Sequence, residues 1–149
     1  MTRWLRPLLG FGALLLTVQA GAQTIPSAMP QHRMVTLADV KWVGGADGLA
    51  SAVVEGNPQR PDSAYSLLLR LRDGRWIPPH WHPRDKAVVV LQGTLLFGSG
   101  ESIDSVHATV APAGSIVQVP ATMHHYEGAR GETILLLYGK GPLITNYVK

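Results

Sequence analysis

The feature that most constrains the fold is a regular alternation of short apolar runs with turn-forming residues from residue 35 onward. The runs cover residues 50–54, 64–72, 87–91 (AVVVL), 94–97, 115–119, 133–138 (TILLLY) and 143–148, and most are bounded by glycine, proline, aspartate or asparagine. Such spacing predicts an all-β sandwich or barrel, with a hairpin between 87–91 and 94–97 and a single helical turn at 37–40. The alternation alone leaves a jelly roll, an immunoglobulin-like sandwich and a lipocalin-like barrel open.

The N-terminus has the pattern of a secretory signal peptide. Arg3 and Arg6 precede an apolar run at 8–18 (LLGFGALLLTV), and the small residues 20–22 (AGA) supply a cleavage signal. The run is shorter than the roughly 20 apolar residues that span a bilayer, so no membrane association is expected after cleavage. We therefore predict a signal peptide at 1–22, a flexible lead at 23–33 and one domain at 34–149, exported to the periplasm or secreted.

Composition excludes several classes of function. The 149-residue chain contains no cysteine, which rules out disulfide scaffolds, thiolate metal sites, iron–sulfur clusters and a cysteine nucleophile. The formal net charge is +3, with 13 basic and 10 acidic residues. Because Arg3 and Arg6 belong to the predicted signal peptide, the remaining chain is nearly neutral, and a nucleic-acid partner is not expected.

The histidines are the candidate chemical groups. Four of the six lie in two clusters, His80-Trp81-His82 and His124-His125. On a strand, residues i and i+2 point to the same face, so His80 and His82 can reach one point, whereas only one member of the adjacent pair can join them. Imidazole is the commonest neutral metal ligand, and this pattern therefore indicates a metal site inside a β-barrel.

Two spaced motifs resemble those of the cupin family. The first reads Gly74, five residues, His80-Trp81-His82, three residues, Lys86, six residues, Gly93. The second reads Gly114, five residues, then Pro120 to His125, with Ala129 at the position of the motif asparagine. Both motifs occur in the family's order, about 30 residues apart, and the resemblance covers nearly all of residues 34–149.

The resemblance implies a cupin-type double-stranded β-helix, or jelly-roll, barrel over 34–149. It also implies that His80, His82 and His125 are the ligands of a divalent metal ion: Fe, Mn, Ni, Cu or Zn. Imidazole suits all of these ions, so the sequence does not select one. Cupins often pair through their outer sheets, which makes a homodimer compatible with the resemblance.

The chain departs from the family pattern at the metal-binding acid. Lys86 stands where the first motif has glutamate, and an ammonium group close to a divalent ion is unfavourable at low dielectric. Glu127 follows His125 by two residues and shares its face on a continuous strand, so it could supply the carboxylate or pair with Lys86. Thr122 replaces the glycine of the second motif, which requires a turn without positive φ.

These residues leave two classes of function open. The first is a metal-dependent enzyme of oxygenase or isomerase type on a small molecule, and three neutral ligands would favour an anionic one. The second is a non-catalytic small-ligand-binding cupin with a degenerate or empty metal site, which Lys86 favours. The sequence does not decide whether the chain is catalytic. Lys86, Glu127, His124 and Gln92 are the expected pocket residues beside the metal ligands.

Overall fold

The computed structural model describes residues 31–149, so the predicted signal peptide and most of the predicted lead lie outside the described residues. Within this range the chain is almost entirely β, as expected, and no helix is long and apolar enough to span a membrane. The elements in order are η1 (Leu37–Asp39), β1 (Val43–Gly44), β2 (Leu49–Gly56), β3 (Ala64–Leu71), β4 (Trp76–Trp81), β5 (Lys86–Ser99), β6 (Thr109–Pro112), β7 (Ile116–Val119), β8 (His125–Lys140) and β9 (Asn146–Tyr147).

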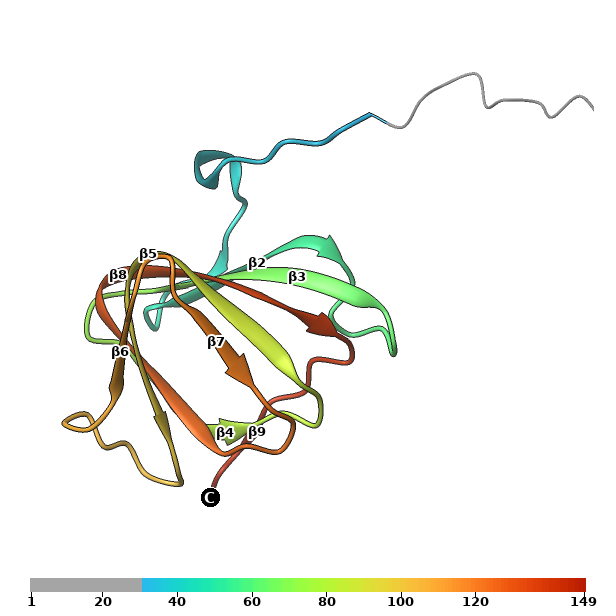
Figure 1. Cartoon of the computed structure of the whole chain (residues 1–149). Helices are drawn as coiled ribbons and strands as arrows, with labels where there is room; N and C mark the ends of the chain where they lie inside the picture. The colour runs from blue at the N-terminus through green and yellow to red at the C-terminus, as the bar shows by residue number, and fades with distance from the viewer. Residues whose placement is uncertain (1–30) are drawn as a thin grey trace, which may run out of the picture. The chain divides into compact units, whose positions relative to one another are not determined.

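Strand β8 connects most of the barrel. One edge pairs with β5 along nearly the whole strand, from Ser99↔His125 to Lys86↔Gly139. The other edge pairs with β4 near its start and with β3 near its end. All these pairings are antiparallel, and β2 and β1 extend the sheet beyond β3. The long β5–β8 pair therefore runs from the part of the barrel that contains β4 to the part that contains β3 (Figure 1).

The core consists of the inward-facing apolar residues of these strands. The most completely buried are Leu71, Val88, Val90, Leu95, Val119 and Leu135. Burying a side chain of this size contributes about 1.5–3 kcal/mol relative to an exposed position. The core cluster fills the interior around the β5–β8 ladder, and most of the buried polar residues lie together beside it: His80, His82, Lys86, His125 and Glu127.

Several strands, among them β5 and β8, differ from the sequence-based expectation. The hairpin predicted between 87–91 and 94–97 is wrong, because β5 continues through Gly93 beside β8, with register shifts on both sides of Gln92. Gly93 has a φ of +75°, and a Cβ there would lie 2.4 Å from the carbonyl oxygen of Glu132. Glycine thus allows a bulge in place of the turn. Strand β8 also begins at His125, before the predicted 133–138 run.

The turn before β8 does not meet the condition under which threonine can replace the motif glycine without strain. Thr122 has a φ of +64°, which is left-handed and costs a residue with a Cβ roughly 1–2 kcal/mol. In this conformation the Thr122 amide donates a 2.8 Å hydrogen bond to the carbonyl oxygen of His82. The strained turn therefore fastens the loop before β8 to the segment that carries a candidate ligand.

Candidate metal centre

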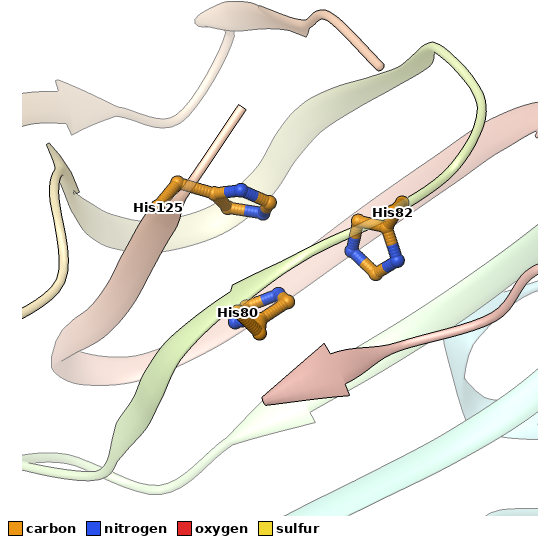
Figure 2. Close-up of side chains that lie close together, drawn as sticks. All are labelled: His80, His82 and His125. Atoms are coloured by element: carbon orange, nitrogen blue, oxygen red, sulfur yellow. The ribbon is translucent and has the colours of Figure 1, made fainter. Parts of the chain in front are cut away.

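Three histidine side chains meet in the barrel interior. His80 lies on β4, His82 directly follows that strand, and His125 is the first residue of β8. His80 and His125 are directly opposite in the β4–β8 register, which brings the two motifs together. All three are buried, and each offers a ring nitrogen within 4.8 Å of the other two (Figure 2).

Backbone carbonyls fix the orientation of each ring. The Nδ1 atoms of His80, His82 and His125 lie 2.8, 2.7 and 2.8 Å from the carbonyl oxygens of Pro78, Ile144 and Met123, respectively. A carbonyl only accepts hydrogen bonds, so each Nδ1 carries the proton and each neutral ring presents the lone pair of Nε2. This is the arrangement by which protein groups orient metal-ligating imidazoles.

The surroundings keep these rings neutral. Burial and, to a smaller extent, the charge of Lys86 lower the pKa of His82 from 6.5 to about 4. Burial likewise lowers the pKa of His125 to about 4, although the hydrogen bond to Met123 opposes this shift. The pKa of His80 is also lowered, chiefly by burial. Neutral imidazole is the form that binds metal, so protons compete little at neutral pH.

Several buried polar atoms at this centre lack a partner. Among the described residues, Nε2 of His82, Nε2 of His125 and Oε1 of Glu127 are buried and make no hydrogen bond. Buried polar groups are usually satisfied, and each unsatisfied one costs about 1–3 kcal/mol. Three imidazole nitrogens and a carboxylate oxygen form a donor set that suits Fe, Mn, Ni, Cu or Zn. The residues present therefore fit a divalent metal ion.

Lys86 and Glu127 form a buried ion pair beside the imidazoles. Lys86 Nζ lies 3.7 Å from Glu127 Oε1, and both side chains are almost inaccessible to solvent. The same Oε1 lies 3.9 Å from Nε2 of His125. Burial raises the pKa of Glu127, but the charge of Lys86 is the largest of the effects that lower it, and its pKa lies below the usual value. Glu127 is thus an anion placed between the ammonium group and the imidazoles.

A cavity opens onto these polar groups. Its volume is about 380 Å³, and His80, His82, Lys86 and Glu127 lie in its lining. The remaining lining is mostly apolar and comes from β1, β2, β3, β4, β8 and the C-terminal segment: Val43, Gly44, Leu49, Ala50, Ser51, Leu67, Leu69, Ile77, Leu137, Leu143, Thr145 and Tyr147. This size and polarity are typical of small-molecule sites.

Two expected pocket residues lie elsewhere. Gln92 lies at the β5 bulge beside Gly93, where the register with β8 shifts. Its side chain is exposed there and does not line the cavity. His124 stacks on Trp81 and lies 3.2 Å from Glu101, also outside the cavity lining. Adjacent strand residues face opposite ways, which explains why His125 points inward and His124 does not.

The groups that orient the rings were not predicted from the sequence. Pro78 and Met123 each precede their histidine by two residues, so a local pattern could have indicated them. Ile144 is 62 positions from His82, and no local signal connects the two. Tyr147 was also missed; it is the cross-strand partner of His80 and lines the cavity.

Comparison with known proteins gives the family and the fold. Residues 30–144 match the family described as ChrR Cupin-like domain. Among curated proteins, the chain is 28% identical over 124 residues to mouse (Mus musculus) peripheral-type benzodiazepine receptor-associated protein 1. That alignment covers 70% of this chain and spans only 7% of the length of the mouse protein.

Solved structures show the same fold at low identity. A Klebsiella pneumoniae protein with a double-stranded β-helix domain matches with a TM-score of 0.61 and 16% identity, covering 80% of this chain and 99% of that one. The DMSP lyase DddQ of Ruegeria pomeroyi matches with a TM-score of 0.58 and 19% identity, covering 74% of this chain and 61% of the lyase chain. The cupin-type double-stranded β-helix predicted from the sequence is confirmed.

The buried histidines predict a pH-dependent stability of the metal-free chain. Between pH 6.5 and about 4 these histidines are neutral in the folded state but take up protons in the unfolded state. Because the unfolded state binds more protons, the free energy of unfolding falls as the pH decreases from 6.5 toward 4. Urea unfolding midpoints at pH 7 and at about pH 5 measure this loss, above the range in which carboxylates titrate. His82→Gln should reduce the loss.

His32→Gln is the matched control, since His32 is an exposed histidine outside the barrel strands. It should leave the pH dependence close to that of the unchanged chain. An equal loss of stability with pH in the His82→Gln and unchanged chains would contradict the assignment of this dependence to the buried cluster.

Proposed function

The chain belongs to the cupin family, as a ChrR cupin-like domain, and we propose that it binds a divalent metal ion through His80, His82 and His125. The observation that carries the proposal is the convergence of three buried, neutral rings whose Nδ1 protons are fixed on backbone carbonyls. Their Nε2 lone pairs face a common space, and a cation is the group that satisfies all three at once.

We further propose that the centre serves a metal-dependent reaction of oxygenase or isomerase type on a small anionic molecule. A three-histidine site leaves coordination positions open, and the bound ion would supply Lewis-acid or redox chemistry there. The protein's own contribution is a largely apolar cavity with the charged pair Lys86–Glu127 in its lining. A lyase among the structural neighbours supports an enzymatic role, because it is an enzyme with the same barrel fold.

A second candidate function follows from Lys86. A buried ammonium beside the imidazoles opposes a cation electrostatically, and this favours a non-catalytic module that holds a small ligand without metal. The cavity is equally suited to that role. The two candidates differ in whether the purified chain contains metal.

The metal content of the purified chain tests the proposal. Protein produced without a histidine tag should contain about one Fe, Mn, Ni, Cu or Zn ion per chain by elemental mass spectrometry. His82→Ala removes one of the three converging nitrogens and should abolish most of this occupancy. His107→Ala, at an exposed position outside the cluster, should retain it. A metal-free chain that takes up none of these ions would favour the second candidate.

We also propose that Glu127 is the fourth ligand, in place of the acid that Lys86 replaces. Glu127→Gln should then weaken metal binding by about tenfold or more, measured by competition with a fluorescent chelator. The double variant Lys86→Met/Glu127→Gln should bind as weakly. If Glu127 only neutralises Lys86, removing both charges would instead restore the affinity of the unchanged chain.

We propose, finally, that the chain is exported, on the strength of the signal pattern at residues 1–22. Expression of the full sequence in a Gram-negative host should give a periplasmic product whose intact mass begins at Gln23. Full-length protein that stays in the cytoplasmic fraction would contradict export.

A further inference from the structure

Lys86 is a buried cation that is not among the proposed metal ligands. It is the first residue of β5, its side chain is 3% exposed, and it lines the cavity. Lysine is almost never fully buried unless paired, because an ammonium group loses its hydration. Its presence at the floor of an apolar cavity therefore needs a compensating anion.

Glu127 compensates only part of this cost. The distance of 3.7 Å between Nζ and Oε1 exceeds hydrogen-bonding distance, although an ammonium group has three N–H donors. Oε1 is also 3.9 Å from Nε2 of His125, so a cation held by the imidazoles competes with Lys86 for the same oxygen. The lysine thus retains donors for a ligand in the cavity.

The charges at the cavity floor favour an anion. Imidazoles bind a metal in their neutral form, and the charges of Lys86 and Glu127 cancel, so a bound divalent ion would leave this part of the cavity positively charged. The rest of the cavity lining is mostly apolar, and Leu49, Leu67, Leu69, Leu137 and Leu143 all contribute to it. A fitting ligand has one anionic end and an apolar body.

Building on the proposed function, we propose that Lys86 binds the carboxylate of a small monocarboxylic acid with an apolar body, and thereby determines the specificity of the site. The carboxylate accepts hydrogen bonds from the ammonium group, and the hydrocarbon body contacts the leucine wall. The substitution of lysine for the expected acid thus provides an anchor for the ligand.

The test compares acids with their neutral amides. Isovalerate and phenylacetate, with isovaleramide and phenylacetamide, are titrated by calorimetry into the full chain with and without metal. The metal-loaded chain should bind at least one acid about tenfold more tightly than its amide. Failure of every acid to bind at millimolar concentration would overturn the proposal.

Metal-free variants isolate the role of the lysine. Glu127→Gln removes the competing anion and should strengthen binding of the acid. Lys86→Met/Glu127→Gln should bind the acid about tenfold more weakly than Glu127→Gln does, and its binding of the amide should be unchanged. If Glu127→Gln does not fold, the double variant is compared with the unchanged chain and should still bind the acid more weakly. Equal affinity for the acid with and without Lys86 would show that the lysine only neutralises the charge of Glu127.

The control is Lys140→Met, which removes an exposed lysine at the end of β8 and should not alter acid binding. Because these comparisons are made without metal, they remain decisive if the metal proposal fails. Loss of metal binding with retained, Lys86-dependent acid binding would disprove only the proposed metal function.

Discussion

The antiparallel pairing of β5 with β8 is the interaction on which both the barrel and its polar centre depend. It places Lys86 opposite Gly139 at one end and Ser99 opposite His125 at the other. Between these ends, buried residues such as Val88, Val90 and Leu135 fill the core. Because β4 pairs with the start of β8 and β3 with its end, the same ladder fixes the cavity walls relative to the imidazoles.

Charge balance is the second constraint at this centre. Each ring has a lowered pKa because it is buried, and none contributes a positive charge at neutral pH. Lys86 and Glu127 then remain as an isolated pair in a region of low dielectric, where removal of one partner is far more costly than removal of both. The pair therefore has to be considered as a unit in any account of metal or ligand binding.

The sequence predicted the fold and the histidine cluster because both follow short-range rules. Strand alternation and motif spacing identified the barrel, and the two-residue period explained why His80, His82 and His125 converge whereas His124 turns away. The bulge at Gly93 and the strained Thr122 turn were misjudged, because their conformations depend on contacts with β8 and His82. Gln92 was expected in the pocket but is exposed, because its position depends on the register shifts beside Gly93.

The hydrogen bonds of the three rings have a consequence for the order of assembly. His80 and His125 are each oriented by a carbonyl two residues earlier, so their acceptors form together with their own strands. His82 depends on Ile144, which follows β8 in the chain and precedes β9. During synthesis all three histidines leave the ribosome before that acceptor does. The orientation of the three rings is consequently completed late, when the segment around residue 144 reaches His82.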